Sequence, residues 1–363
     1  MDKKQKYKTA LIGCGRIGFI LENDPLRNKP CTHLGGAKAA GIKINYACDI
    51  NKERMQLFSE KVLIPSGNCY SDYKKLLSEQ RPELVIISTW TNSHAEIGIC
   101  AARNGAKTII CEKPIASNLK DAESFIIECE KHNTKLIINH ERRYDTRYRI
   151  VKKLLEAGKI GEIKTVFALI LNSGKSSINP KIEDGGGPLL HDGTHMIDII
   201  RYLFGDISHV RGDIEKSSKH GFEDRATAWL KTQSGIDVFL EAGGKRKYFT
   251  FELQIFGTEG KIVIGNGYQQ LFLNKISKYY TGFRDLSEKK FPSTKGINYF
   301  KKEYIEAKNI LGGNSVNITS SGLDGYRALE AIHAIYLSSY LKSKIIKLPI
   351  KPDKINLHKI FQL

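Results

Sequence analysis

Three glycines near the start of the chain have the spacing of a loop that binds a dinucleotide. Gly13, Gly15 and Gly18 form the sequence GCGRIG directly after the apolar run TALI. Glycine permits a tight turn and lets the backbone come close to a pyrophosphate. The next apolar run, INYAC, is followed by Asp49, whose carboxylate could accept hydrogen bonds from an adenosine ribose and would repel a 2′-phosphate. The glycines and this acid together predict a site for NAD rather than NADP.

A lysine at the end of a later apolar run is a second candidate. Lys113 directly follows the run TIICE. The carboxyl ends of parallel strands form the edge at which such sheets bind ligands. An ammonium group there could polarise a substrate oxygen or stabilise an alkoxide. The alternative is an exposed lysine at the end of a strand.

The sequence HDGTH holds the third set of candidates, His191, Asp192 and His195. An imidazole titrates near neutral pH, so His195 could accept the proton of an alcohol while a hydride leaves the carbon. Two histidines four residues apart also resemble a zinc-binding motif. We predict no metal, because the chain offers no obvious third ligand and Gly193 would weaken the helix that such a motif needs.

Alternating strands and helices are expected to position the first candidates. In about the first 140 residues, short β-rich runs alternate with longer segments of helical periodicity. This order is typical of parallel strands joined by crossover helices, and it predicts an α/β fold with a doubly wound Rossmann sheet. The predicted strands are residues 9–13, 44–48, 83–89, 108–112 and 135–139, and the predicted helices are residues 72–80, 94–104 and 118–132.

The second half of the chain has a different pattern. After a helical segment at residues 145–158, the runs IKTVFALIL, ATAWLKT, IDVFLEAG, FTFELQIFG and KIVIG predict an α+β domain on an open, largely antiparallel sheet. A length of 363 residues suggests two domains. We place the NAD-binding domain at residues 1–140 and the substrate-binding domain at 141–345, with a helix at 322–341 that returns toward the first domain and a tail at 346–363.

Composition limits the classes of partner. Lysines and arginines exceed aspartates and glutamates by 57 to 39, so the net charge of +18 suggests an anionic partner. The positive residues are spread along the chain without a recognition motif, so we predict no nucleic acid and consider a phosphate-bearing substrate. The apolar runs are too short to span a membrane. Seven cysteines without a CxxC pair, and a start without a secretory signal, predict a cytoplasmic protein with reduced thiols.

A long segment separates the glycine loop from the acid that follows it. The distance from Gly18 to Asp49 exceeds the usual spacing of about 20 residues, so we interpret residues 22–36 as an insertion in the first crossover. It is either a surface loop or a lid over the cofactor, since long loops in compact domains are often functional.

Four stretches carry a family resemblance: STWTNSHAEIGICAARNGAKTIICEKPIA, HERRYDTRYRIVKKLLEAGKIG, GGGPLLHDGTHMIDIIRYLFG and SGLDGYRALEAI. In this order they resemble the Gfo/Idh/MocA oxidoreductases, the family of glucose-fructose oxidoreductase and inositol dehydrogenase. The resemblance covers nearly the whole chain. It implies an N-terminal Rossmann domain and a C-terminal domain whose open sheet carries the substrate pocket, with a homodimer or homotetramer formed through that sheet.

The resemblance also implies roles for single residues. Lys113 corresponds to a lysine beside the nicotinamide and the substrate hydroxyl, and Pro114 to a proline that is often cis. His195 corresponds to the catalytic histidine. Where many members have an aspartate, this chain has His191. Either His191 replaces that aspartate on the same helical face, which the spacing favours, or Asp192 reaches in from a distorted turn.

The sequence TWTNSH departs from the family pattern TPxxxH, because Trp90 stands in place of the proline. By resemblance, Asn92 and His94 contact the cofactor, whereas the alternative is that Asn92 or Ser93 caps the following helix. The predicted cofactor-binding residues are Gly13, Gly15, Arg16, Ile17, Gly18, Asp49, Thr89, Asn92, His94, Glu112 and Lys113.

Two neighbouring arginines complete the candidates. Arg142 and Arg143 could hold a substrate phosphate bidentately, and the alternative is a solvated face or a salt bridge. The predicted substrate-binding residues are therefore Lys113, Arg142, Arg143, Asp192 and His195.

The resemblance implies an NAD-dependent oxidoreductase that transfers a hydride from a secondary alcohol of a sugar, sugar acid or nucleotide sugar. Two other functions of the same fold are alternatives. One is a glycoside hydrolase that uses bound NAD as a transient oxidant, and the other is a regulator that senses dinucleotides without catalysis.

Overall fold

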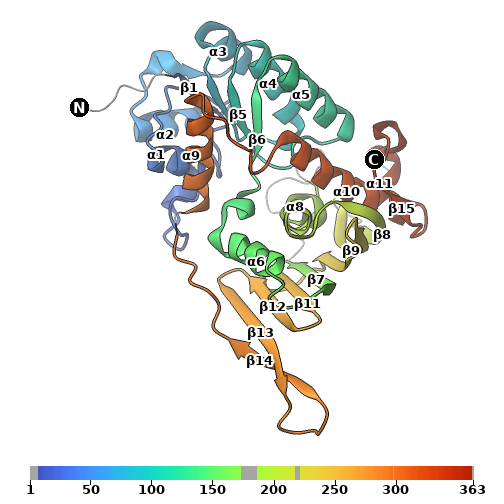
Figure 1. Cartoon of the computed structure of the whole chain (residues 1–363). Coiled ribbons are helices and arrows are strands. Elements are labelled where there is room, and N and C mark those ends of the chain that lie inside the picture. The colour runs from blue at the N-terminus through green and yellow to red at the C-terminus, as the bar shows by residue number, and fades with distance from the viewer. Residues whose placement is uncertain (1–6, 173–185, 217–220, 297, 362–363) are drawn as a thin grey trace. The chain divides into compact units, whose positions relative to one another are not determined.

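The computed structural model describes residues 7–172, 186–216, 221–296 and 298–361 (Figure 1). The ends of the predicted first domain and tail, residues 1–6 and 362–363, lie outside these ranges, as does Gly185 of the GGG sequence. The chain forms two compact units. The first unit comprises Met1–Tyr144 and Ile297–Tyr326, and the second comprises Asp145–Gly296 and Arg327–Leu363.

One segment that was predicted to lie in the substrate-binding domain packs in the first unit. Residues 297–326 belong to the first unit, and their helix α9 (Tyr299–Leu311) packs against α1 (His33–Ala39). The reason is an apolar face on α9. Its residues Phe300, Tyr304 and Ala307 are buried in the hydrophobic core of the first unit.

The first unit contains a sheet of six parallel strands in the order β3-β2-β1-β4-β5-β6. This is the strand order of a dinucleotide-binding Rossmann fold. The five predicted strands are confirmed, whereas the two-residue β3 was not predicted. The strands are β1 (Thr9–Ile12), β2 (Tyr46–Cys48), β3 (Cys69–Tyr70), β4 (Leu84–Ile87), β5 (Thr108–Cys111) and β6 (Lys135–Ile138).

The strands of this sheet are short and apolar because helices cover them. All residues of β1, β4 and β5 are buried, as expected of parallel strands with both faces covered. The three helices predicted between residues 72 and 132 are confirmed. The connecting helices after α1 are α2 (Lys52–Val62), α3 (Tyr73–Gln80), α4 (Thr91–Arg103) and α5 (Leu119–Lys131), of which α2 was not predicted.

The inserted segment interrupts the first crossover. A turn follows the glycine loop, then the short helix η1 (Ile20–Asn23), and α1 begins only at His33. The backbone N–H groups of His33 and Leu34 donate to the carbonyl oxygens of Ile17 and Gly18, at 3.0 Å each. Residues 33–36, the last part of the predicted insertion, therefore already belong to helix α1. The irregular part of the insertion ends before residue 33.

The second unit contains a sheet of nine strands in the order β14-β13-β12-β11-β7-β10-β9-β8-β15 (Figure 1). Strands β7 and β10 pair in parallel, and the other neighbours are antiparallel, which confirms a largely antiparallel sheet. The strands are β7 (Ile163–Leu171), β8 (Ile207–Lys216), β9 (Glu223–Thr232), β10 (Asp237–Gly243), β11 (Thr250–Gly257), β12 (Gly260–Gly265), β13 (Tyr268–Ile276), β14 (Arg284–Lys289) and β15 (Ile346–Lys347).

Alternating side chains give this sheet one covered and one open face. In β7, Val166 and Ala168 are buried, while Phe167 between them is 41% exposed. Two helices on the covered face matter for the site, α7 (Pro188–His191) and α8 (Gly193–Phe204). The remaining helices are η3 (Glu141–Tyr144) in the first unit, α6 (Thr146–Glu156), η5 (Pro352–Lys354) and α11 (Leu357–Phe361) in the second, and α10 (Gly322–Tyr340), within which the boundary falls. No described helix has the length and apolar character to cross a membrane.

Candidate active site

The three glycines of the GCGRIG loop differ in what surrounds them. A Cβ on Gly13, whose φ is +96°, would lie 2.6 Å from the backbone carbon of Ser88, and one on Gly18 would lie 2.5 Å from the carbonyl oxygen of Gly13. Packing within the protein therefore requires glycine at both positions. Around Gly15, no other described atom lies within 4 Å of a Cβ position. This open space beside the backbone fits the close approach of a pyrophosphate.

Asp49 lies at the end of β2 and is fixed by the glycine loop. Its Oδ2 accepts the backbone N–H of Cys14 at 2.7 Å, and its Oδ1 accepts that of Asn51 at 2.8 Å. Each carboxylate oxygen can accept a second hydrogen bond. The acid is thus held next to the glycine loop, and its predicted contact with an adenosine ribose stays a prediction. On the loop itself, Arg16 is exposed and Ile17 is half-buried.

The predicted contacts on α4 divide into exposed and internal residues. His94 is buried between two backbone carbonyls, with Nδ1 2.8 Å from the oxygen of Pro114 and Nε2 3.1 Å from that of Thr89. Burial lowers the pKa of His94, although both carbonyls oppose this effect. His94 therefore ties two strand-end loops together. Asn92 is exposed, and the cofactor role predicted for these residues stays a prediction.

The alternative of a capping side chain at this helix is wrong. Helix α4 begins at Thr91 with Trp90 as N-cap, and the side chain of this N-cap residue makes no capping hydrogen bond. Asn92 and Ser93 lie inside the first turn. The Ser93 hydroxyl donates back to the carbonyl oxygen of Trp90 at 2.8 Å.

Lys113 follows β5 at the carboxyl edge of the sheet, as predicted, and the Lys113–Pro114 peptide is cis. The preceding Glu112 is engaged inside the protein. Its Oε1 lies 3.0 Å from Nε2 of His33 and 2.5 Å from Nδ2 of Asn139. Burial would raise the pKa of Glu112, but the His33 bond, the Lys113 charge and the Asn139 bond together lower it to about 2. The residue before Lys113 is thus a carboxyl group whose ionised form is favoured.

The residues that hold Glu112 were not found from the sequence. His33 starts α1 and its Nδ1 lies 2.8 Å from the hydroxyl of Tyr304 on α9. His33 is 79 residues away from Glu112 in the sequence, and Tyr304 is 271 residues away from His33. No local spacing signals such a network, which only the packing of α9 assembles.

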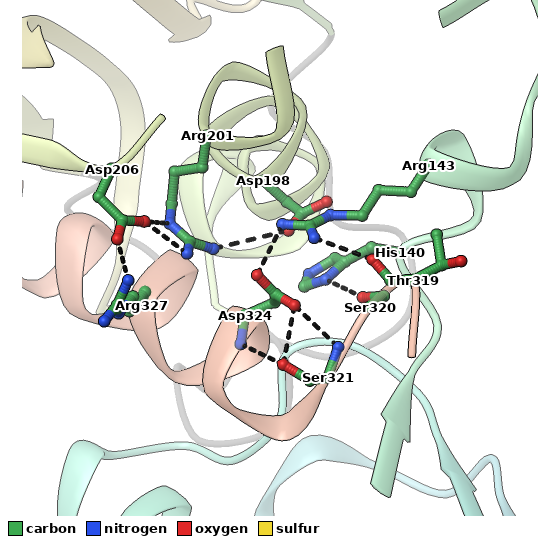
Figure 2. A network of polar contacts seen from close by, with 10 residues as sticks. All are labelled: His140, Arg143, Asp198, Arg201, Asp206, Thr319, Ser320, Ser321, Asp324 and Arg327. Carbon is green, nitrogen blue, oxygen red and sulfur yellow. Dashed lines mark hydrogen bonds and ion pairs between the residues drawn. The ribbon is translucent and has the colours of Figure 1, made fainter. Parts of the chain in front are cut away.

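The two neighbouring arginines have different surroundings. Arg143 is buried, and its guanidinium lies 3.0 Å from the Asp324 carboxylate and donates to the carbonyl oxygen of Thr319 at 3.0 Å (Figure 2). For Arg143, the salt-bridge alternative is therefore formed. The Nε of Arg142 lies 4.0 Å from the carboxylate of Glu141. The substrate contact predicted for Arg142 stays a prediction.

We expect Arg143→Ala to lower the free energy of unfolding by about 2 kcal/mol, because it leaves the Asp324 carboxylate without its buried charged partner. Urea denaturation of Arg143→Ala, Asp324→Ala and the double variant measures the coupling between them. Arg27→Ala, which removes an exposed ion pair with Asp24 in the same unit, is the matched control with a smaller loss. A coupling of zero between Arg143 and Asp324 would contradict this role.

The HDGTH segment forms two helices. Helix α7 ends at His191 and α8 begins at Gly193, with Asp192 at the junction. The backbone of Asp192 stays in the right-handed helical region (φ −94°, ψ −33°), so the two alternatives given for His191 and Asp192 stay predictions. The side chain of His191 is 60% exposed, whereas that of Asp192 is 31% exposed and accepts a hydrogen bond from Nδ2 of Asn172 at 3.0 Å.

His195 lies in the first turn of α8, and its backbone N–H donates to the carbonyl oxygen of Asp192 at 3.2 Å. One turn later, Asp198 is buried and lies 3.9 Å from Arg201, which also pairs with Asp206 at 2.7 Å. Arg327 also contacts Asp206 (Figure 2). This ionic cluster holds α8 in the second unit. Among the described residues, no group of three or more His, Cys, Asp or Glu side chains could hold a metal ion.

Two family models match the chain. The model of an oxidoreductase family with an NAD-binding Rossmann fold matches residues 7–140, and that of the GFO/IDH/MocA C-terminal domain matches residues 148–263. The chain belongs to the Gfo/Idh/MocA family. The family resemblance, the fold class, NAD as cofactor and an oxidoreductase activity, all expected from the sequence, are confirmed.

Relatives within the Gfo/Idh/MocA family include named dehydrogenases. Inositol 2-dehydrogenase of Salmonella typhimurium is 26% identical over 361 residues, which is 95% of this chain and 98% of that protein. Myo-inositol 2-dehydrogenase of Thermotoga maritima is 28% identical over 269 residues, 71% of this chain and 75% of that protein. The fold is similar to that of the WlbA dehydrogenase from Bordetella pertussis, solved with NADH and UDP-GlcNAcA. Its TM-score is 0.78 at 20% identity, over 96% of this chain and 99% of that one.

Proposed function

We propose that this protein is an NAD-dependent dehydrogenase that oxidises a secondary alcohol of a sugar, a sugar acid or a nucleotide sugar. The observation that carries the proposal is the place of Lys113. It stands at the ligand-binding edge of the NAD-binding sheet, directly after the buried Glu112 carboxylate. The named relatives act on inositol, and WlbA was solved with a nucleotide sugar, so the substrate class spans free polyols and activated sugars.

Each candidate residue has a role in this reaction. The open space at Gly15 would hold the pyrophosphate, and Asp49 would accept the adenosine ribose hydroxyls. NAD, when bound, supplies the hydride acceptor. Lys113 would orient the substrate hydroxyl and stabilise the charge that develops on its oxygen. His195 would accept the proton from that hydroxyl, with Asp192 as the polar group beside it.

The substrate side favours an anionic group. The net charge of +18 attracts anions in general. Arg142 and Arg143 are the two arginines predicted to bind a substrate phosphate, and Asp324 of the same unit already engages the guanidinium of Arg143. We therefore assign Arg142 a contact with a phosphate or carboxylate of the substrate, and Arg143 the support of the η3 turn that carries it.

The expected result is accumulation of NADH, read at 340 nm, when the protein is mixed with NAD and one of a panel of inositols, sugar acids and nucleotide sugars. NADP should not replace NAD, because Asp49 would repel its 2′-phosphate. Sugar release without net NADH would instead indicate the NAD-using glycoside hydrolase. Tight NAD binding without turnover of any substrate would indicate the dinucleotide-sensing regulator.

The open face of the second sheet suggests a homodimer or homotetramer. Phe167 and Phe239 are 41% and 43% exposed, and their rings stack with centroids 5.4 Å apart. Exposed aromatic pairs of this kind are enriched at interfaces between proteins. A cytoplasmic location is supported by the seven cysteines, all of which are free thiols.

A further inference from the structure

A buried acid supports the start of the HDGTH segment. Glu223 is the first residue of β9, and its side chain is fully buried in the second unit. Its Oε1 accepts the backbone N–H of Leu189 at 2.8 Å, and its Oε2 accepts the hydroxyl of Tyr336 on α10 at 3.2 Å. Burying a carboxyl group is costly unless it is hydrogen-bonded.

Glu223 accepts a backbone hydrogen bond at the start of α7, as an N-cap side chain does at the start of other helices. The first backbone N–H groups of a helix have no partner within it. Helix α7 has Gly187 as its N-cap, which offers no side chain. The Glu223 carboxyl supplies the acceptor from the neighbouring strand, and the backbone of Leu190 also donates to it.

Close packing between Glu223 and Gly187 fixes this arrangement. A Cβ at Gly187 would lie 2.4 Å from the carboxyl carbon of Glu223 and 2.5 Å from its backbone oxygen. On the other side, Pro188 packs against β10, where a Cβ at Gly243 would come within 2.8 Å of its ring. The first turn of α7 therefore has little room to shift while Glu223 is in place.

A short path of hydrogen bonds leads from α7 to the candidate catalytic residues. The N–H of Asp192 donates to the carbonyl oxygen of Pro188 at 3.1 Å, and the N–H of His195 donates to that of Asp192 at 3.2 Å. Asn172 at the end of β7 holds the Asp192 carboxylate from the other side. A displacement of α7 would thus reach both Asp192 and His195.

We propose that Glu223 is a positioning residue, which locks the α7–α8 turn and thereby sets the place of Asp192 and His195 in the reaction. The proposal rests on the dehydrogenase function assigned above to these two residues. Glu223 itself touches neither substrate nor cofactor in this role. It acts through the backbone of α7.

The lock depends on pH in a defined way. Burial raises the pKa of Glu223 to about 7, against opposing hydrogen bonds from the backbone and Tyr336. An opened turn would expose the carboxyl to water and return its pKa to near 4.3. Opening therefore releases a proton between about pH 4.5 and 7, so the lock weakens as pH rises through this window and is constant above it. Titratable or charged groups on the neighbouring elements are His191 on α7, Asp224 and Arg225 on β9, Lys216 on β8, and His333 and Tyr336 on α10.

Hydrogen exchange tests the lock without any need for activity. In the full-length protein with NAD bound, we expect protection of the amides at residues 189–195, corrected for intrinsic exchange, to fall at least tenfold from pH 5 to pH 7 and to level off above. In Glu223→Gln, whose amide oxygen still accepts the Leu189 N–H, protection should not change with pH. This variant also separates the effect of Glu223 from that of His191 on the same helix. An unchanged pH dependence in Glu223→Gln would overturn the proposal.

Kinetics test the consequence for the reaction. Glu223→Leu removes the acceptor, and we expect kcat to fall at least tenfold while the Kd for NAD stays within twofold. Glu223→Gln should restore kcat to within threefold of the wild-type value. Tyr336→Phe is the matched control, because it removes the bond to the other carboxyl oxygen and leaves α7 capped, so its kcat should stay within twofold.

The outcomes separate this proposal from the proposed function. A purely structural acid would lower the melting temperature of Glu223→Leu and Tyr336→Phe alike with kcat unchanged, which would overturn the positioning role. Should Glu223→Leu fail to fold, hydrogen exchange of wild type and Glu223→Gln decides. Should the wild type turn over no substrate, the proposed function fails, and the same exchange experiment still confirms or refutes the lock.

Discussion

Replacing His195 with alanine is expected to lower sugar oxidation at least about a hundredfold while NAD binding stays normal. A positioned general base contributes about 10² to 10⁴ to the rate. The glycine loop and Asp49, which we propose bind the dinucleotide, belong to the first unit, whereas His195 lies on α8 of the second. Steady-state rates and NAD titration of His195→Ala measure the two quantities separately.

The pH profile and two further variants make this test specific. Part of the lost rate should return at high pH, because hydroxide can assist removal of the proton. His209→Ala, on β8 of the same unit, controls for the loss of an imidazole elsewhere. If His195→Ala kept near-normal turnover while Asp192→Ala or His191→Ala abolished it, the base would be one of the residues at the break between α7 and α8.

Lys113→Ala is expected to be at least as damaging, and without recovery at high pH. Its ammonium would stabilise the negative charge that develops on the substrate oxygen, and hydroxide cannot replace a positive charge. Loss of an interaction made only in the transition state should appear in kcat and in kcat/KM alike. Single-turnover and steady-state measurements with saturating NAD provide both constants.

A lysine at the opposite end of the same strand provides the control. Lys107 directly precedes β5 and lies 3.9 Å from Glu83 on the surface, so Lys107→Ala removes an equal charge far from the ligand edge. Lys113→Arg keeps the charge but changes its shape and reach. Full activity of Lys113→Ala would show that this strand-end lysine is not part of the chemistry.

The order of elements in the first unit could be predicted because the strands are continuous apolar runs. Residues 84–87 and 108–111 are wholly apolar but for Thr108, and both are buried strands. The five runs predicted in the second half also form strands. The continuous apolar runs of the buried strands and the alternating runs of the half-exposed strands could therefore both be recognised in the sequence.

Elements with few apolar residues escaped prediction. Helix α2 buries only Met55 and Phe58, and most residues of β14 are exposed, so neither shows a clear period. Helix α9 was not predicted for a different reason. Its buried face includes Glu303 and Glu306, and charged residues at core positions disguise the apolar pattern.

The candidate residues were easier to find than their supports. Gly13, Asp49 and Lys113 stand next to strands and could be placed from local sequence. The partner of Arg143 is Asp324, and that of Glu223 is Leu189, residues brought together by packing across long stretches of chain. At HDGTH, local spacing could not show that Asp192 stands between two helices while its own backbone stays right-handed helical.

The packing of α9 into the first unit bears on how the chain folds during synthesis. The ribosome delivers Tyr144 about 155 residues before α9 begins, a delay of roughly 8 to 30 s at about 5–20 residues per second. Throughout that time the core around Phe58 and Ala37 lacks Phe300 and Tyr304. The nascent first unit must wait, with apolar surface uncovered, while the entire nine-stranded sheet except β15 is translated. Chaperone demand should therefore be highest just before residue 311 leaves the exit tunnel.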